Sequence, residues 1–512
     1  MAIVTPIEAP PGGRRQLGLA NPATREPIGK IEVQNAHDVA SALKAARQAQ
    51  PEWAARSVNE RARYLTRAVQ TLIERQDEFI DVLLRESGKP RTEILMMEIY
   101  SACDVLTYYA KHAVGMLRSE KRPLHGFMRL LKKLRIEYRP LGVIGVISPW
   151  NGPFILSLSP TIQALLAGNA VLLKPSEVTP YSGKLVGDLL ETVGLPDGLL
   201  TVLMGDGETG EAVVEAGVDK ISFTGSVKTG RSVAESCARQ LIPCTLELGG
   251  KDPMIVCEDA NLDNAAGGAI VGAFLNSGHV CCGTERVYVI DEVADEFTQK
   301  VLERVARLRQ GSRGEFDVGA IFWDRQLEII EAHVADAIAK GAKLLAGGRR
   351  NPGFDGLFFE PTVLADVNHD MLVMQEETFG PVLPIMRVSD QNEAVRLANQ
   401  TPYGLGANVW TRDGRGGIEL ARRIDSGSVC INDMAVTYGV LEAPFGGLKS
   451  SGIGQVHGPN ALRDFTHPKP ILIDRFGGRA TAGLYPYSFK NEARIQQLIR
   501  ILYRSPLGRW LS

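Results

Sequence analysis

The chain has 512 residues, of which 44% are hydrophobic and 23% are charged, as expected for an ordered globular protein of two or three domains. Its 57 Lys and Arg residues nearly balance 59 Asp and Glu residues, for a net charge of -2, so the overall charge gives no electrostatic case for nucleic acid, and we expect no nucleic-acid partner. The first residues show no signal-peptide pattern and no apolar run could span a bilayer, so the sequence predicts a cytoplasmic protein.

The first 120 residues predict helices. Hydrophobic residues recur with a helical period over 37–50, 59–86 and 92–117, and Gly88, Lys89 and Pro90 interrupt the last two stretches. Residues 121–135 differ from the rest of the chain because they carry six Lys or Arg residues and no acid.

Short β-branched segments alternate with helical patterns from residue 142 onward. The first series of expected strands covers residues 142–147, 170–173, 199–204 and 220–223. Thr179 and Pro180 predict the start of one intervening helix, and Gly194 predicts its end. A second series, with strands at 253–256 and 286–290 and a helix at 296–309, follows Gly249 and Gly250. The alternation predicts an α/β protein with two parallel-sheet domains.

Seven cysteines are an odd and sparse set without any CxxC pair, so we expect neither a disulfide framework nor a metal site. Cys281 stands apart, because it lies in the segment Phe274-Leu-Asn-Ser-Gly-His-Val-Cys-Cys282. Backbone amides in such a glycine-containing turn can lower a thiol pKa from about 8.5 and supply a reactive thiolate. An isolated cysteine is more often a buried structural residue, so Cys281 alone does not identify an active site.

Two glycine motifs compete for a dinucleotide. Gly205 to Gly210 matches GxGxxG, and Gly225 to Gly230 has a GxxxxG spacing; each follows an expected strand. Either could place a helix N-terminus against a pyrophosphate, although each motif alone is a weak signal. The acid expected about 20 residues after Gly225 is Glu247, which gives Glu247 a candidate role as a ribose ligand.

Four further turns, each fixed by glycine or proline, present polar side chains at the ends of expected strands, where α/β sheets bind ligands. They are PWNGP at 149–153, KPSE at 174–177, ELGGK at 247–251 and EETFGP at 376–381. Together with the Cys281 segment, they favour one shared site over five unrelated turns.

At these residues the chain resembles the aldehyde dehydrogenase superfamily, from about Asn21 to Pro470. The resemblance implies an NAD-binding domain at 1–119 and 140–248, a catalytic domain at 249–448, and an oligomerisation segment at 120–139 and 466–478. It implies a homodimer or homotetramer, with residues 479–512 as an extension. It also implies that Cys281 is the nucleophile, that Glu247 is the base activating water, and that Asn151 and the amide of Cys281 bind the oxyanion.

NAD is the cofactor that the resemblance implies. Lys174 and Glu177 would bind the adenosine ribose, which leaves Glu247 for catalysis. The other residues implied around the cofactor are Ile147, Ser148, Pro149, Trp150, Ser176, Gly205, Gly210, Phe223, Gly225, Ser226, Gly230, Leu248, Glu377 and Phe379. A carboxylate at position 177 should repel a 2′-phosphate and favour NAD over NADP, although Lys174 could offset its charge.

The implied reaction oxidises an aldehyde to a carboxylic acid through a thiohemiacetal and a thioester on Cys281. Glu247 favours hydrolysis of the thioester to a free acid. His279 replaces the usual Gln of the family, and its expected role is to orient the turn. Gly152 and Ser159 replace aromatic residues that commonly line the substrate funnel, and Tyr438 could line its entrance. These changes predict a hydrophobic medium- or long-chain aldehyde, or an aromatic one.

Two alternatives remain at this point. A semialdehyde dehydrogenase acting on a substrate such as succinic semialdehyde would need a cation near the funnel, and Arg286 or Lys449 could supply it. A catalytically silent structural or binding member is disfavoured by the intact set of Asn151, Glu247 and Cys281.

The C-terminal extension is basic and amphipathic. Arg479, Lys490, Arg494, Arg500, Arg504 and Arg509 face a single acid, Glu492, and residues 493–503 place four apolar side chains on one helical face. The extension is either an arm that packs on a neighbouring subunit or an interfacial helix that makes peripheral membrane contact.

Overall fold

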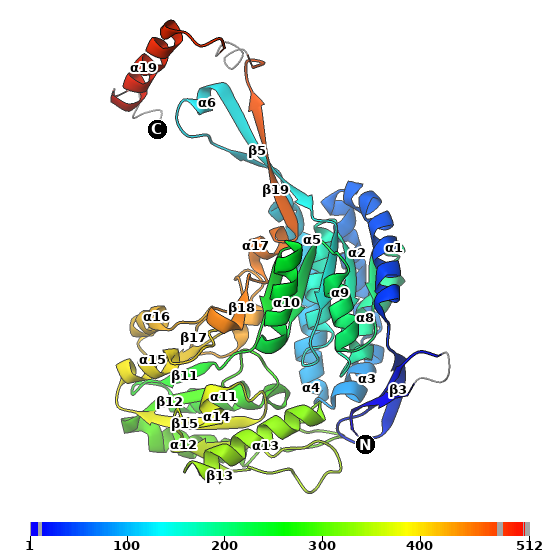
Figure 1. The fold of residues 1–512 in the computed structure, drawn as a ribbon. Coiled ribbons are helices and arrows are strands. Elements are labelled where there is room, and N and C mark those ends of the chain that lie inside the picture. Colours follow the sequence, from blue (N-terminus) through cyan, green and yellow to red (C-terminus); the bar gives the residue numbers. More distant parts are fainter. Residues whose placement is uncertain (1, 9–12, 479–484, 505, 507–512) are drawn as a thin grey trace.

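The computed structural model describes residues 2–8, 13–478, 485–504 and 506. Two α/β lobes lie one above the other, and a long antiparallel arm extends from the upper one (Figure 1). Each lobe is built on a mostly parallel sheet packed against helices, which confirms the expected fold class. Arg479 and Arg509 of the basic extension lie outside the described residues.

The six-stranded sheet of the upper lobe has the order β18-β10-β9-β6-β7-β8, and only the edge strand β18 is antiparallel to its neighbour. Its four central strands, β10, β9, β6 and β7, are almost wholly buried, as expected of a parallel sheet with covered faces, and the two edge strands are partly exposed. The strands are β6 (Val143–Ile147), β7 (Ala170–Lys174), β8 (Leu200–Val202), β9 (Lys220–Thr224), β10 (Cys244–Glu247) and β18 (Gly452–Ile453). The helices of this lobe include α1 (Ala36–Ala55), α2 (Val58–Glu74), α3 (Gln76–Ser87), α5 (Ser101–Leu117), α7 (Ile155–Leu166), α8 (Pro180–Thr192), α9 (Gly207–Glu215), α10 (Val227–Gln240) and α17 (Gly458–Arg463).

The seven-stranded sheet of the lower lobe has the order β13-β14-β15-β12-β11-β16-β17, with β13 antiparallel at one edge. The strands are β11 (Pro253–Val256), β12 (Arg286–Ile290), β13 (Lys343–Ala346), β14 (Thr362–Ala365), β15 (Val382–Val388), β16 (Asn408–Trp410) and β17 (Cys430–Ile431). The helices include α11 (Leu262–Phe274), α12 (Asp291–Val305), α13 (Asp324–Ala339), α14 (Leu372–Gln375), α15 (Gln391–Asn399) and α16 (Gly414–Arg423). Short 3-10 turns lie at η2 (Leu275–Gly278), η3 (Val436–Gly439) and η4 (Lys449–Ser451).

Two small antiparallel sheets complete the chain. One comprises β1 (Val4–Ile7), β2 (Gln16–Ala20) and β3 (Pro27–Glu32). The arm has the order β19-β5-β4, in which β19 (Thr466–Asp474) pairs with β5 (Lys132–Pro140) along its whole length. β4 (Glu120–Arg122) and α6 (Met128–Leu131) precede β5, and α19 (Phe489–Arg504) lies beyond β19 at the outer end of the arm (Figure 1). Within the described ranges, no helix combines the length and the apolar character needed to cross a membrane.

Two helical stretches differ from the prediction. The pattern over 59–86 is divided into α2 and α3 at Arg75, whose backbone angles (φ -108°, ψ 16°) leave the helical region although the apolar periodicity continues. The stretch expected from residue 92 begins with α4 (Arg91–Glu93) and then widens into a π-helix, η1 (Ile94–Tyr100), before α5. π-turns are rare and often lie at functional sites.

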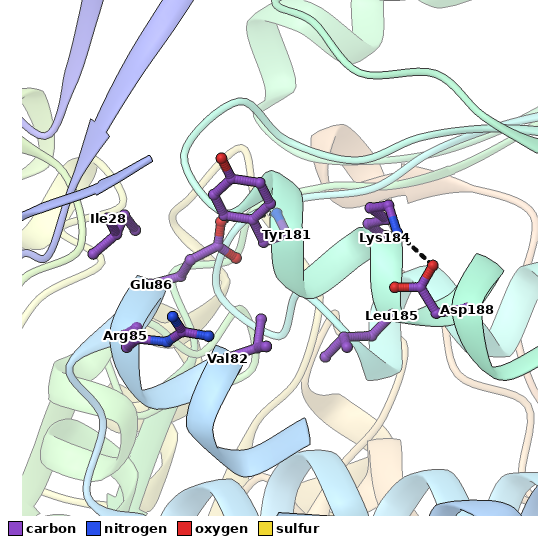
Figure 2. Close-up of a pocket in the computed structure, with 8 residues that line it drawn as sticks. All are labelled: Ile28, Val82, Arg85, Glu86, Tyr181, Lys184, Leu185 and Asp188. Atoms are coloured by element: carbon purple, nitrogen blue, oxygen red, sulfur yellow. Dashed lines mark hydrogen bonds and ion pairs between the residues drawn. The ribbon is translucent and has the colours of Figure 1, made fainter. Parts of the chain in front are cut away.

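Glu86 of α3 caps the start of α8. Thr179 occupies the predicted N-cap position, but its hydroxyl makes no capping hydrogen bond. Instead, the Glu86 carboxylate accepts hydrogen bonds from the amides of Tyr181 (2.8 Å) and Ser182 (2.5 Å). Figure 2 shows Glu86 beside Tyr181 in a pocket of about 370 Å³ between β3, α3 and α8. Burial raises the pKa of Glu86 to about 7.

Candidate active site

A cavity of about 810 Å³ is lined by both lobes, at the carboxyl ends of β6, β7, β9 and β10. Parallel α/β sheets bind ligands at this edge. All of the predicted site residues line the cavity except Gly205 and Gly230. Those that line it are Ile147, Ser148, Pro149, Trp150, Asn151, Lys174, Ser176, Glu177, Gly210, Phe223, Gly225, Ser226, Glu247, Leu248, Cys281, Glu377 and Phe379.

Gly205 and Gly230 have packing reasons to be glycine. A Cβ at Gly205, whose φ is +156°, would lie 2.0 Å from Oγ1 of Thr209, and one at Gly230 would lie 2.5 Å from a methyl group of Leu248. Neither residue lines the cavity. At these two positions glycine is needed because the side chains of Thr209 and Leu248 pack against the backbone.

Cys281 is half-buried in the cavity wall. The Cys282 thiol, followed by the backbone amides of Cys282 and Cys281, lowers the pKa of the Cys281 thiol by hydrogen bonding, against the opposite effect of burial. The same contact between the two thiols raises the pKa of Cys282. Cys281 is therefore the thiol of the pair that ionises first.

The turn before Cys281 is held in an uncommon backbone conformation. Asn276, Ser277 and Gly278 all have positive φ angles, of 55°, 54° and 80°. A Cβ at Gly278 would lie 2.1 Å from the carbonyl carbon of Gly380, so only glycine fits. Three consecutive left-handed residues need support from the surrounding structure.

Asn276 supplies that support and joins the turn to Asn151. Its backbone amide donates to Oε1 of Glu93 at 2.9 Å. Its side-chain amide donates to the carbonyl oxygens of Asn151 (2.9 Å) and His279 (3.0 Å). Asn276 thus fixes the main chain of Asn151 relative to the turn that carries Cys281.

Asn151 is nearly buried, and its side-chain amide donates to the carbonyl oxygen of His279 at 3.0 Å. A side-chain amide has two N–H protons. One is used in this contact, which leaves the other for an oxyanion in the cavity.

A buried ion pair holds the segment after Asn151. Nζ of Lys89 lies 2.6 Å from Oε1 of Glu98, and both side chains are fully buried. Oε2 of Glu98 accepts hydrogen bonds from the amides of Phe154 (3.2 Å) and Ile155 (3.0 Å) at the start of α7. The π-helix η1 therefore delivers a carboxylate to the N-terminus of the helix that follows the Asn151 turn.

His279 is a packing residue. Its ring lies against those of Trp150, Phe322 and Phe379, with centroids 4.9, 4.8 and 5.7 Å apart. Neither ring nitrogen has a hydrogen-bond partner among the described residues. Burial, together with the nearby charge of Lys89, lowers the pKa of His279 to about 3. The ring is therefore neutral and orients the turn, as expected.

Glu247 lies at the end of β10 with little exposed surface. Both of its carboxylate oxygens are buried without a hydrogen-bond partner in the described part of the chain. Burial, followed by the nearby Cys281 charge, raises the pKa of Glu247 well above its ordinary value. A carboxylate of raised basicity that faces a cavity suits proton abstraction from water.

A second buried network supports Glu377 and Phe379. Lys251 forms an ion pair with Glu285, whose carboxylate accepts hydrogen bonds from the amides of Thr378 (3.0 Å) and Phe379 (2.8 Å). Oε1 of Glu377 accepts from the amide of Gly250 at 3.1 Å. Burial, reinforced by the charge of Glu285, raises the pKa of Glu377 to about 8.

The apolar end of the cavity is lined by Leu156, Pro160, Tyr438, Phe445 and Val456. The Tyr438 ring packs edge-on against Phe445 (5.1 Å) and His457 (4.7 Å between centroids). Tyr438 therefore lies in the funnel, as expected.

The expected widening of the funnel is only partly correct. Ser159 lines the cavity, and its hydroxyl accepts a hydrogen bond from Gln163 at 3.1 Å. Gly152 opens no space, because Leu156 fills it: a Cβ at Gly152 would lie 3.1 Å from Cδ1 of Leu156.

Neither proposed cation for a semialdehyde lines the cavity. Arg286 is fully buried, and its guanidinium donates to the carbonyl oxygens of Lys251 (2.8 Å) and Ala398 (3.0 Å). Lys449 donates to the carbonyl oxygen of Asn399 and lies 3.4 Å from Asp425. Neither residue supplies a cation to the cavity, because each is used in structural contacts.

The cations that do line the cavity come from β7, α10 and the start of α13. They are Lys174, Lys228, Arg239 and Arg325. The described segments that form the apolar end, α7 and residues 436–456, contribute none of the cationic lining.

Comparison with known proteins agrees with this geometry. The model of the aldehyde dehydrogenase family matches residues 10–471. The chain belongs to the aldehyde dehydrogenase family. It is 41% identical over 476 residues to a 4,4′-diapolycopene aldehyde oxidase from Methylomonas sp, covering 93% of this chain and 89% of the relative. It is also 41% identical to a putative succinate-semialdehyde dehydrogenase [NADP(+)] 2 from Mycobacterium ulcerans, covering 88% of this chain and 87% of the relative.

Solved structures give the same result. A Mycobacterium tuberculosis aldehyde dehydrogenase complexed with NAD+ is 36% identical, with a TM-score of 0.85, and the match covers 89% of this chain and 94% of that one. A protein described as the putative aldehyde dehydrogenase PutA from Anabaena variabilis is also 36% identical, with a TM-score of 0.85, and the match covers 90% of this chain and 97% of that one.

Several residues that shape this aldehyde dehydrogenase site were not found from the sequence. Glu93, Glu98 and Asn276 position the turns that carry Asn151 and Cys281, and Cys282 lowers the pKa of Cys281. Of these, only Cys282 and Asn276 lie inside a recognised motif, and no spacing in the sequence links Glu93 or Glu98 to it.

Proposed function

We propose that this aldehyde dehydrogenase converts an aldehyde to a carboxylic acid, with Cys281 as the nucleophile, Asn151 at the oxyanion and Glu247 as the general base. One observation carries the proposal. A thiol with a lowered pKa, an amide with a spare N–H and a buried carboxylate without a partner line the same cavity.

Each group has a defined task in this reaction. The Cys281 thiolate forms a bond to the aldehyde carbon, and the negative charge on oxygen is stabilised by Asn151 and by the backbone N–H of Cys281. When bound, NAD supplies the acceptor for the hydrogen that leaves this carbon. Glu247 then accepts a proton from water, whose oxygen attacks the thioester. The bond to sulfur breaks, and the Cys281 thiolate and a free acid are released.

The residues present fit NAD. Gly225 and Ser226 open α10, whose N-terminal amides suit a pyrophosphate. Glu177 and Lys174 suit ribose hydroxyls, and Glu377 and Phe379 suit the nicotinamide half. Because Nζ of Lys174 lies 3.0 Å from Glu177, a 2′-phosphate would have to compete with Glu177 for this cation, which supports NAD over NADP.

A hydrophobic medium- or long-chain aldehyde, or an aromatic one, is the proposed substrate. The apolar end of the cavity supports it through Leu156, Phe445 and Val456. The similarity to a 4,4′-diapolycopene aldehyde oxidase points the same way, since that name denotes a long apolar aldehyde. Because other relatives are named as succinate-semialdehyde dehydrogenases, succinic semialdehyde is the alternative substrate, and the experiment below includes it.

The domain roles are part of the same proposal. Residues 1–119 and 140–248 would bind NAD, and residues 249–448 would supply Cys281. The arm formed by 120–139 and 466–478 would join protomers in a homodimer or homotetramer. Its strand β19 has β5 on one side only in the described sheet, so its other edge can pair.

NADH formation with hexanal, dodecanal, benzaldehyde and succinic semialdehyde tests these assignments. We expect Cys281→Ala to abolish turnover and Cys103→Ala, a change at a half-buried thiol of α5, to preserve it. Glu247→Gln should give a burst of NADH followed by slow turnover, because the thioester accumulates. Substantial steady turnover by Cys281→Ala would refute the mechanism, and a preference for succinic semialdehyde would refute the apolar substrate.

A further inference from the structure

Helix α19 has no buried residue in the described structure, and its apolar face combines the exposed Ile495 and Ile499 with the half-buried Leu498 and Leu502. Ile495, Leu498, Ile499 and Leu502 recur at helical spacing on one side. Ile495 and Ile499 are 46% and 52% exposed. Figure 1 places the helix at the outer end of the arm, away from both lobes.

The remaining surface of α19 is strongly cationic. Lys490, Arg494, Arg500 and Arg504 stand against one acid, Glu492, in a protein whose net charge is -2. No acidic side chain in the described ranges forms an ion pair with any of these four cations. An apolar stripe opposite unpaired cations is the pattern of a helix that lies in the plane of an anionic bilayer surface.

Aromatic side chains lie at both ends of the helix. Tyr487, Phe489 and Tyr503 are 74%, 91% and 74% exposed. Rings with a polar edge favour the boundary between lipid headgroups and acyl chains. Exposure in water is costly for such a cluster, whereas insertion at that boundary buries the rings and leaves the tyrosine hydroxyls hydrated.

The tip of the arm carries a second apolar and basic element at the same end of the molecule (Figure 1). Met128 and Leu130 of α6 are exposed. Residues 121–135 around them contain six cations and no acid, although Arg122 pairs with Glu120 and Lys132 pairs with Asp474.

We propose that α19 is an in-plane membrane-binding helix that docks the enzyme on anionic lipid, with the tip of the arm as a supporting contact. Charge decides between lipid and a second copy of the chain. Two α19 helices related by a two-fold axis would place their cations against each other, whereas anionic headgroups neutralise them. The proposal is independent of the catalytic assignments, because vesicle binding is measured without substrate or cofactor.

Co-sedimentation of the full chain with vesicles tests the proposal. Vesicles of phosphatidylcholine mixed with phosphatidylglycerol should bind the enzyme, and phosphatidylcholine alone should bind little. Ile495→Glu with Ile499→Glu should reduce the partition coefficient by at least about tenfold, because it removes apolar contact and adds negative charge. Replacing Arg494, Arg500 and Arg504 with Gln should have a similar effect, and high salt should release the wild type.

A matched control distinguishes a specific effect of α19 on vesicle binding from a general effect of exposed hydrophobic residues. Ile73→Glu with Ile418→Glu makes the same change at side chains that are 54% and 47% exposed on α2 and α16, and vesicle binding should not change. Sedimentation velocity of each variant without lipid supplies the second readout. The proposal is overturned if the wild type does not bind anionic vesicles, or if the α19 double variant binds them as well as the control double variant does. It is also overturned if Ile495→Glu with Ile499→Glu lowers the oligomer mass without changing vesicle binding.

Discussion

Two side chains act on the reactive thiol and oxyanion site through other residues. Asn276 donates hydrogen bonds to the carbonyl oxygens of Asn151 and His279, and the Cys282 thiol lowers the pKa of the adjacent Cys281 thiol. Neither needs to touch the substrate. Asn276 fixes the placement of the thiolate relative to the oxyanion donor before reaction, and Cys282 favours the ionised form of Cys281.

Asn276→Ala should lower kcat by about tenfold to a hundredfold, because Asn151 loses its fixed position relative to the Cys281 amide. Alkylation of Cys281 by iodoacetamide should change much less, since it needs no oxyanion site. Asn261→Ala, which removes an N-cap from α11, is the control for general destabilisation. Equal loss of kcat and of alkylation rate would assign Asn276 to stability alone.

Cys282→Ala should move the ionisation of Cys281 to higher pH. Hydrogen bonding by the Cys282 thiol is the largest influence that lowers the pKa of Cys281, so its loss favours the protonated thiol. The pH dependence of iodoacetamide alkylation measures the shift, and Cys257→Ala, a change at a buried thiol beside β11, should leave the midpoint in place. An unchanged midpoint in Cys282→Ala would contradict this role.

Glu177→Gln should raise kcat/KM for NADP relative to NAD by about tenfold, because Lys174 loses a competing carboxylate. Glu191→Gln, at an exposed position of α8, should not alter the ratio. Initial rates with both cofactors at one aldehyde concentration measure it. A ratio that stays constant in Glu177→Gln would remove position 177 from cofactor choice.

At the scale of elements, two helix N-termini in the upper lobe, those of α7 and α8, bind carboxylates from other helices. Glu86 of α3 caps α8, and Glu98 of η1 caps α7. These two caps tie the helices that follow β7 and β6 to the helical layer, and thereby fix the turns that line the cavity.

Glu86→Ala should destabilise the protein by about 1–3 kcal/mol, because two buried amides lose their acceptor. Urea unfolding followed by circular dichroism measures this change. Glu74→Ala, at an exposed position of α2, should change the free energy of unfolding by less than about 0.5 kcal/mol. Equal effects of the two substitutions would show that the capping contact contributes nothing.

At the scale of the whole molecule, the arm joins the upper lobe to the elements at its outer end. Leu472 and Ile473 of β19 are both exposed, although they point to opposite faces of the strand. Exposed apolar residues on both faces of an edge strand are expected where a second chain covers it.

Leu472→Lys with Ile473→Lys should lower the oligomer mass in sedimentation equilibrium while the far-ultraviolet circular dichroism stays that of a folded protein. The reason is that two lysines on each protomer would be buried at the proposed interface. Ile73→Lys with Ile418→Lys is the matched control. An unchanged mass in the β19 variant would exclude this edge as the subunit contact.

The sequence predicts which strand ends carry the reactive residues better than it predicts which residues hold those turns in place. Pro149, Pro175 and Gly249 mark the ends of strands, so the turns that carry Asn151, Lys174 and Glu247 were recognisable. Asn276 and Glu93 lie 183 residues apart and meet only through packing of the two lobes. Leu156 fills the space beside Gly152 from one helical turn away, which residue size alone does not reveal.

The π-helix η1 makes this region sensitive to changes in chain length. A π-turn accommodates one more residue than the α-helix it interrupts, and each residue of an α-helix advances by about 100°. Deleting one residue between Ile94 and Tyr100 would restore regular helix but would rotate Glu98 relative to the buried face of α5. Either Lys89 would lose its partner or Leu106 and Tyr109 would leave the core. A one-residue deletion therefore cannot keep both the Lys89–Glu98 ion pair and the core packing of Leu106 and Tyr109, whereas a point substitution can.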